Sequence, residues 1–326
     1  MYMTKLLNKY VLSVLAAGLA VGVAWLAISS NDSQKVQEER PLVSALTVTP
    51  EVPSSVSFCG HTIDLTRYDR HENFDRELSS FTYLHSTTLL LFKRANRYFP
   101  VIEPILKKYG IPDDFKYLAV IESHLDPRAS SPVRAIGIWQ FMESTGKQYG
   151  LTITPSVDER NHVEKSTIAA CRYLKDAYNK FGDWIIVASS YNAGMGRISG
   201  EQTQQNVDSP LDMWLVEETT RYPYRILAIK QIFENPYRYG FVINVRDLYK
   251  PIRTREVPVS ADIIDLSDFA KKQGLTYADI KRFNPWLRDR KLTTGGKKYA
   301  IDIPEEEDLF YRRPNTYVHD SRWVVN

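Results

Sequence analysis

One glutamate occupies a position where its side chain should not face water. Pro112 marks the start of a predicted helix in which Phe115 and Leu118 fall on one apolar face, and Glu122 is the next position on that face. Glutamates are seldom buried without a reason. Desolvation would raise the pKa of this carboxyl, and so would the negative end of the helix, which Pro127 forces to stop nearby. The pattern predicts a carboxylic acid that keeps its proton near neutral pH and serves as a general acid.

The same pattern also fits a solvated or salt-bridged glutamate at a helix end. The residues that follow favour the first interpretation. The run from Gly137 to Met142 places an aromatic side chain, an amide and a thioether, in Trp139, Gln140 and Met142, next to a glycine that permits close backbone approach. Such a mixture lines sugar-binding clefts, although each of these residues alone is more often part of a core.

Other chemistries lack their motifs. The nearest string to a zinc-protease motif, which begins at His71 and Glu72, has no second histidine, and the sequence contains neither a nucleophile elbow nor a phosphate-binding loop. Gly194 and Gly196 follow no strand, which argues against a dinucleotide site. His124 points to another side of the helix from Glu122, so the two form no acid–base pair. We therefore predict an enzyme without metal or cofactor.

Four ordered segments resemble the membrane-bound lytic murein transglycosylase D group of the soluble lytic transglycosylase family, whose fold is that of goose-type lysozyme. They are Ile121 to Pro127, Ser131 with Pro132, Gly137 to Met142, and Ala188 to Gly194, and the resemblance extends over roughly residues 84–239. Weaker similarity lies at residues 157–160 and 217–222. Four motifs at suitable separations make this a specific match.

The resemblance implies a set of site residues around a single catalytic acid and base. Glu122 matches that acid/base, Ser131 and Gln140 match residues that bond the sugar, Met142 matches a cleft-lining residue, Tyr191 and Asn192 match a substrate-contacting pair, and Tyr222 resembles a tyrosine that orients the glutamate. The implied reaction cleaves the β-1,4 bond between N-acetylmuramic acid and N-acetylglucosamine in peptidoglycan without water. Its product ends in a 1,6-anhydro ring, and the 2-acetamido group of the substrate replaces a second carboxylate.

Two alternatives stay open. A hydrolytic lysozyme would need a second carboxylate, for which Asp126, Glu143 and Asp183 are candidates, although Asp183 is better placed as the N-cap of the next helix. A non-catalytic wall-binding scaffold is the other alternative. It is suggested by the LysM-like module of residues 256–304 together with Arg134, which stands where the family usually has glycine. If that position has a positive φ, the arginine costs about 1 kcal/mol or intrudes on the cleft.

The elements that must position these residues are predicted to be helices. Apolar residues at helical spacing indicate a helix from Leu84 to Pro100, another through residues 170–181 and a third from Trp184, and strand-like alternation is nearly absent before Tyr239. Short β-prone runs follow at 241–245 and 256–259, then a helix at 266–272 and a closing strand at 298–304. The fold class is mainly α, with a lysozyme-like helical catalytic domain followed by a small α+β module.

The small module resembles a LysM domain in residues 256–304, including Tyr277, Ile280 and Trp286. Residues 246–300 hold thirteen Lys or Arg against seven Asp or Glu, whereas the whole chain has a net charge of only +3. The resemblance implies weak binding of glycans that contain N-acetylglucosamine. The alternative is a packing module that braces the catalytic domain.

The first residues read as a membrane segment. No charged residue occurs between Tyr10 and Asn31, and Lys5 and Lys9 precede this run, so we predict a membrane helix with its N-terminus in the cytoplasm. A small-residue sequence around Ile28 also fits a cleaved signal peptide. The rest of the chain then lies in the cell envelope, on the periplasmic side. The small net charge argues against nucleic acid as a partner.

These patterns divide the 326 residues into successive parts. They are a membrane anchor or signal peptide at 1–28, a linker at 29–57, a catalytic domain at 58–240 with its core at 100–240, a linker at 241–255, the LysM-like module at 256–304 and a tail at 305–326. The two cysteines, Cys59 and Cys171, lie on the exported side, and we expect them to stay unpaired.

Overall fold

The computed structural model describes residues 47–312 and 314–325. Residues 50–326 form one compact unit. The predicted membrane segment lies outside the described residues. Within those residues, no helix is both long and apolar enough to cross a membrane.

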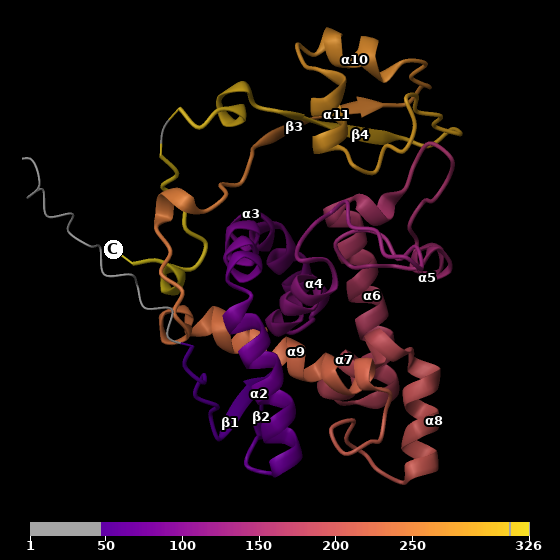
Figure 1. Cartoon of the computed structure of the whole chain (residues 1–326). Coiled ribbons are helices and arrows are strands. Elements are labelled where there is room, and N and C mark those ends of the chain that lie inside the picture. The colour runs from indigo at the N-terminus through magenta and orange to yellow at the C-terminus, as the bar shows by residue number, and fades with distance from the viewer. Residues whose placement is uncertain (1–46, 313, 326) are drawn as a thin grey trace, which may run out of the picture. The chain divides into compact units, whose positions relative to one another are not determined.

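Helices make up most of the first part of the unit, and a two-stranded sheet with two helices makes up the second (Figure 1). In chain order the first part contains β1 (Ser55–Phe58), β2 (His61–Asp64), α2 (Tyr68–Tyr83), α3 (His85–Tyr109), α4 (Lys116–Ser123), α5 (Glu143–Gln148), α6 (Val163–Phe181), α7 (Trp184–Ala193), α8 (Met195–Gln205) and α9 (Glu217–Glu234). The second part contains β3 (Thr254–Val259), α10 (Leu266–Lys272), α11 (Tyr277–Phe283) and β4 (Tyr299–Pro304). The prediction of a mainly helical domain followed by a small α+β module is confirmed.

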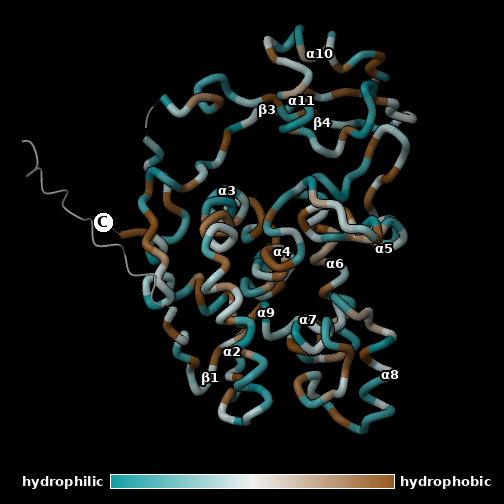
Figure 2. Tube along the Cα trace, viewed as in Figure 1, coloured by the Kyte–Doolittle hydropathy of each residue, from teal (hydrophilic) through white to brown (hydrophobic). Residues whose placement is uncertain are grey.

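Helix α4 lies in the middle of the helical domain. It contacts α9 and α3, and its residues are largely apolar (Figure 2). The predicted apolar face, with Phe115 and Leu118, is fully buried, but so are Val120 and nearly all of Ile121. The helix is therefore surrounded by protein on all sides, and a side chain on it reaches water only where neighbouring elements leave an opening.

Helix α3 is longer than predicted. It runs to Tyr109 with Pro100 and Pro104 inside it, whereas the sequence indicated an end at Pro100. Ile102 and Leu106, beyond the first proline, are buried in the same core as Phe99 before it. Burial of this continuous apolar face offsets the backbone hydrogen bonds that the prolines cannot donate. The helix ends at Gly110, whose φ of 70° few other residues adopt at so low a cost.

The sequence patterns missed several elements and misassigned one. The β1–β2 hairpin and α2 were not predicted, and β1 begins at Ser55, inside the segment assigned to the linker. Residues 241–245 read as β-prone, but they contribute only one isolated bridge, between Ile243 and Val324. These residues are apolar because they pack into the core of the helical domain, where Phe241 and Ile243 are buried.

The small module has its own core around an antiparallel strand pair. β3 pairs with β4 from Thr254–Pro304 to Val259–Tyr299, and α10 keeps the predicted bounds. Leu266, Ile280 and Ile301 are fully buried between the strands and the two helices. Val157, from the helical domain, belongs to the same cluster, and its backbone forms a bridge to Leu287. The module is thus packed directly onto the helical domain.

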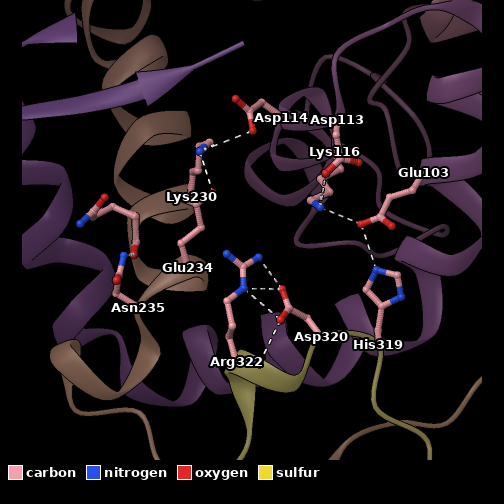
Figure 3. Close-up of polar contacts among 11 residues, drawn as sticks. Glu103, Asp113, Asp114, Lys116, Lys230, Glu234, Asn235, His319, Asp320 and Arg322 are labelled. Carbon is pink, nitrogen blue, oxygen red and sulfur yellow. Dashed lines mark hydrogen bonds and ion pairs between the residues drawn. The ribbon is translucent and has the colours of Figure 1, made fainter. Parts of the chain in front are cut away.

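The chain returns to the helical domain after the module. Asn96, fully buried on α3, accepts the backbone N–H of His319 at 2.8 Å and donates to the carbonyls of Tyr249 and Tyr317, each at 3.2 Å. His319 also meets Glu103 at 2.9 Å, where Lys116 binds the same carboxylate (Figure 3). One buried amide therefore joins the segment that enters the module to the segment that leaves it.

An aromatic anchor completes this return. Trp323 is 2% exposed, and its ring lies 5.4 Å from that of Phe233, 5.7 Å from that of Phe92 and 5.9 Å from that of Phe99, measured between ring centroids. The segment predicted as a tail is therefore a structural part of the helical domain at residues 315–325, and the small module is held from both of its ends.

Replacing this anchor should destabilise the helical domain. We expect Trp323→Ala to lower the free energy of unfolding by about 3–5 kcal/mol, because it leaves a cavity among three phenylalanine rings. Urea denaturation would measure the change. Tyr237→Ala is the control, since Tyr237 is 75% exposed and its loss should matter by less than about 0.5 kcal/mol. A similar small effect for both variants would contradict the packing of Trp323 among the phenylalanine rings.

Candidate active site

Glu122 lies in the last turn of α4, where the backbone reverses sharply. The helix ends at Ser123, and His124 and Leu125 both have positive φ, at 54° and 55°. The hydroxyl of Ser123 donates to the carbonyl of Ile138 at 2.8 Å, which fastens this turn to the loop that carries Trp139. Leu125 is fully buried, so packing against the core stabilises a backbone conformation that leucine rarely adopts.

The carboxyl of Glu122 meets a tyrosine hydroxyl from α9. Tyr222, 3% exposed, donates its hydroxyl hydrogen to Oε1 of Glu122 in a short hydrogen bond. The pKa of Glu122 is raised to about 7, mainly by desolvation and to a smaller extent by the nearby charge of Glu218. The hydrogen bond from Tyr222 and the charge of Arg225 lower this pKa and so limit the shift. The direction agrees with the sequence prediction, and desolvation is its main cause. Glu122 is therefore protonated in a large fraction of the protein molecules near neutral pH.

The loop after α4 is shaped by one glycine. Gly137 has a φ of 84°, and a Cβ atom there would lie 1.9 Å from the carbonyl oxygen of Arg160. Only glycine allows the loop to lie this close to the chain before α6. The amide of Gln140 then donates to the carbonyls of Gly137 at 2.9 Å and Ala129 at 3.3 Å, so its nitrogen is engaged within the loop.

A buried ion pair supports this loop from behind. Arg160, 4% exposed, binds Asp158 at 2.7 Å and donates to the carbonyls of Arg134 and Phe141, each at 3.1 Å. Asp158 in turn donates its backbone N–H to the carbonyl of Trp286 in the small module at 2.7 Å. From the sequence, residues 157–160 showed only a weak similarity to the transglycosylase family. No spacing rule identified Arg160 as the support of the loop. A charged residue type within a matched motif was the one available signal.

Ser131 and Arg134 form a tight turn in the same loop. The hydroxyl oxygen of Ser131 accepts the backbone N–H of Ala135 at 3.0 Å, and its carbonyl accepts that of Arg134 at 2.9 Å. Arg134 has a φ of 65°, in the left-handed region that favours glycine. The positive φ that the sequence analysis considered for this position is present, and an arginine in this conformation costs about 1 kcal/mol. Its side chain is exposed.

The Tyr–Asn pair of α7 lies beside the same loop. Tyr191 donates its hydroxyl to the carbonyl of Trp139 at 2.8 Å, and the amide oxygen of Asn192 accepts the hydroxyl of Thr219 on α9 at 3.0 Å. Burial keeps the pKa of Tyr191 well above its usual value, and the nearby Glu122 raises it further. Met142, 44% exposed, precedes α5. Glu122, Tyr191 and Tyr222 therefore come together from three helices, α4, α7 and α9.

The carboxylates considered as a second base are engaged elsewhere. Asp126 lies 3.3 Å from Arg94, and Glu143 pairs with Lys147 at 2.6 Å on the surface. Asp183 caps α7, as predicted, by accepting the N–H groups of Ile185 and Ile186 at 2.8 and 3.0 Å.

Two further features bear on the chemistry of the site. Sequence reasoning missed Glu218, an exposed residue of α9 that lies one turn before Tyr222 and is close enough to act on the pKa of Glu122. Its spacing of four residues from Tyr222 was the available signal. Within residues 47–312 and 314–325, no three histidine, cysteine or acidic side chains gather as a metal site requires. In the same part of the chain, Cys59 and Cys171 are free thiols.

Two family models match the chain. Residues 100–210 match the transglycosylase SLT domain, and residues 255–307 match the soluble lytic transglycosylase C-terminal LysM-like domain. The first covers the helices that carry Glu122, Tyr191 and Asn192 and ends before α9, which carries Tyr222. Both matches agree with the resemblances found in the sequence, including the lysozyme-like helical fold.

Two similar proteins are both named membrane-bound lytic murein transglycosylases. The chain is 31% identical over 240 residues to membrane-bound lytic murein transglycosylase D of Escherichia coli strain K12, which covers 72% of this chain and 51% of the relative. It is 30% identical over 183 residues to membrane-bound lytic murein transglycosylase F of Salmonella typhi, covering 51% of this chain and 37% of the relative. The chain thus spans about half the length of the first of these relatives and a smaller part of the second.

Solved structures of similar proteins include the 70 kDa soluble lytic transglycosylase of Escherichia coli. It is 24% identical over the matched part, covers 44% of this chain and 24% of its own, and superposes with a TM-score of 0.37. The complex of the 70 kDa soluble lytic transglycosylase with bulgecin A is 21% identical, covers 53% and 30%, and has a TM-score of 0.39.

The raised pKa of Glu122 predicts a pH-dependent stability. At a pH below 4.5, the pKa of the carboxyl in the unfolded chain, Glu122 is protonated in both the folded and the unfolded protein. At a pH above about 7, the folded protein must bury a charged carboxylate. The folded state therefore loses roughly 3 kcal/mol as pH rises through this window. We compare the free energy of unfolding of Glu122→Gln with that of the unsubstituted protein. We expect this difference to shift in favour of the variant by about the same amount between pH 4 and pH 8. Urea denaturation at both pH values measures it. A constant difference would mean that Glu122 is ionised at its normal pKa.

Gly137 should tolerate no side chain. Gly137→Ala forces the loop away from Arg160, and we expect it to lower the free energy of unfolding by about 3 kcal/mol. Gly182→Ala is the matched control. Gly182 has a similar φ of 68° but no atom within 4 Å of an added Cβ, so it should cost only about 1 kcal/mol of backbone strain. Equal losses in thermal unfolding would show that the close approach at Arg160 does not exist.

Proposed function

Because residues 100–210 belong to the transglycosylase SLT family and residues 255–307 to the LysM-like domains of soluble lytic transglycosylases, we propose that this protein is a peptidoglycan lytic transglycosylase. It cleaves the β-1,4 bond between N-acetylmuramic acid and N-acetylglucosamine and leaves a 1,6-anhydro end. The observation that carries this proposal is the raised pKa of Glu122, a half-buried glutamic acid that accepts a hydrogen bond from a tyrosine hydroxyl at the end of α4.

Glu122 acts first as an acid and then as a base. Its proton passes to the glycosidic oxygen while the C1–O bond breaks, and the 2-acetamido oxygen of the muramic acid bonds to C1 in its place. The Glu122 carboxylate then takes the proton of the C6 hydroxyl. The C6 oxygen attacks C1, displaces the acetamido oxygen and closes the anhydro ring, which returns Glu122 to its acid form.

Tyr222 positions the glutamate between these two steps. Its hydroxyl donates to Oε1, which stabilises the carboxylate that exists after the first proton has left. The opposing effects of burial and this hydrogen bond keep the pKa near 7, where one group works both as acid and as base. Tyr222 acts through Glu122 and is a positioning residue.

The remaining site residues are proposed to hold the sugar. The amide nitrogen of Gln140 binds loop carbonyls, so we assign its amide oxygen to a sugar donor. Asn192 accepts from Thr219, so its amide nitrogen is assigned to a sugar acceptor. The hydroxyl of Ser131 is assigned as a donor to the sugar, and that of Tyr191, whose hydrogen is donated to Trp139, is assigned as an acceptor. Met142 offers an exposed apolar surface.

Hydrolysis is the second candidate reaction, and Glu218 is the observation that favours it. This exposed carboxylate acts on the pKa of Glu122 and would be the group to activate a water. Asp126, Glu143 and Asp183 are less suited because each already has a partner. A non-catalytic scaffold that binds the wall is the third candidate.

We assign the protein to the bacterial cell envelope, with peptidoglycan strands as its partner. Relatives at 31% and 30% identity are named membrane-bound lytic murein transglycosylases. The apolar run in residues 10–31 would anchor the chain, with the catalytic domain on the periplasmic side. The LysM-like module would add weak binding to N-acetylglucosamine.

Product analysis on purified peptidoglycan tests this function. Mass spectrometry should detect 1,6-anhydro-muramic ends, and kcat/KM should fall as pH rises above about 7, because Glu122 loses its proton. Glu122→Gln should reduce the rate by at least about 10²-fold. Glu143→Gln, at an exposed ion-paired carboxylate, is the control and should keep the rate.

The alternatives give different outcomes in the same experiment. Reducing N-acetylmuramic ends without anhydro products would assign the protein to hydrolysis, and loss of that activity in Glu218→Gln would identify the base. A folded protein that binds peptidoglycan but releases no product of either kind would assign it to the scaffold class.

A further inference from the structure

One tryptophan of the helical domain faces solvent almost completely. Trp214, in the segment between α8 and α9, is 89% exposed, the largest value among the large apolar side chains of the described residues. Tryptophans are usually well buried, because their indole rings contribute much apolar area to cores. Trp214 makes no such contribution, so folding does not account for its residue type.

The backbone of this exposed residue is nevertheless fixed. Gln205, in the last turn of α8, accepts the N–H of Trp214 at 2.7 Å and donates its amide to the carbonyl of the same residue at 2.9 Å. Gln202, one turn earlier, donates to the carbonyl of Asp208 at 3.2 Å, and Asp212 is bound by Arg70 at 2.9 Å. The segment that carries the indole is thus held from α8 and from α2, and the ring is presented outward from an ordered backbone.

A groove of about 630 Å³ lies between this segment and α8. Trp214, Leu215 and Val216 form one side, and polar side chains of α8, including Arg197, Glu201 and Gln204, form the other. The charges of Arg197 and Glu201 balance, so the groove selects neither an anion nor a cation. An aromatic face opposite amide and charged groups suits a sugar ring, whose faces are apolar and whose edges carry hydroxyl and acetamido groups.

The residues that line the groove are close in the chain to the proposed site. Val216 precedes Thr219 by three residues, a span of at most about 11 Å, and Thr219 donates to the cleft residue Asn192 at 3.0 Å. Arg197 follows Asn192 by five residues, at most about 18 Å along the chain. One side of the groove thus leads directly into α9, which carries Tyr222, and the other side is α8, which begins two residues after the end of α7, the helix that carries Asn192.

We propose that this groove is a remote glycan subsite in which Trp214 stacks on a sugar ring of the same peptidoglycan strand that is cleaved at Glu122. This rests on the proposed function, because it takes the glycan strand as the substrate. Gln205 is a positioning residue, since it acts only through the backbone of Trp214. The subsite makes long strands better substrates than short oligosaccharides that do not reach it.

Steady-state kinetics on strands of different length test this subsite. We expect Trp214→Ala to raise KM for long glycan strands about tenfold, which corresponds to about 1.4 kcal/mol, and to change kcat by less than about twofold. Short oligosaccharides that end within the cleft should be cleaved equally by both proteins. Trp214→Tyr should restore most of the affinity, because it keeps an aromatic face. Gln205→Leu should have an intermediate effect.

The controls separate this proposal from its alternatives. Tyr237→Ala removes another exposed aromatic ring, 75% exposed, from a different part of the domain and should leave KM unchanged. Equal KM values for Trp214→Ala and the unsubstituted protein at every strand length would overturn the subsite. Loss of vesicle binding or of a dimer in Trp214→Ala, with KM unchanged, would also overturn it. Failure of the proposed function looks different, because the unsubstituted protein would then release no anhydro product.

Discussion

The hydrogen bond between Tyr222 and Glu122 is the interaction on which the site depends. It joins the end of α4 to α9, where the charges of Arg225 and Glu218 also act on the Glu122 carboxyl. Burial alone would push the pKa of the carboxyl higher, and a solvated carboxylate would have no proton to give. The balance between desolvation and one donated hydrogen places the pKa at about 7, and that balance exists only while α4, α7 and α9 keep their packing.

The loop opposite this acid is shaped by a few contacts that carry no chemistry of their own. Gly137 lets the loop touch the backbone of Arg160, and the Arg160 guanidinium binds two of its carbonyls. Asp158 pairs with Arg160 and also bonds to Trp286 of the small module. Because Asp158 contacts both Arg160 and Trp286, the LysM-like module is connected to the loop that follows α4.

The segments that enter and leave the module form a second connection between the module and the helical domain. Asn96 holds residues on both flanks of the module, and Trp323 inserts into the aromatic core beneath α3. The module and the helical domain are thus joined at both of the points where the chain passes between them, which restricts the orientation of the module relative to the helical domain. The groove beside Trp214 lies at the opposite end of α9 from this core.

The sequence by itself determined the helical domain, the α+β module and the glutamate at the end of α4, because these follow from local periodicity, turn residues and an acid on an apolar face. It also supplied Tyr222, Tyr191 and Asn192 by resemblance. Only the tertiary structure decided that α3 continues through two prolines, that residues 315–325 return to the core, and that Arg160 supports the loop after α4. Each of these depends on contacts between residues far apart in the chain, which no local pattern encodes.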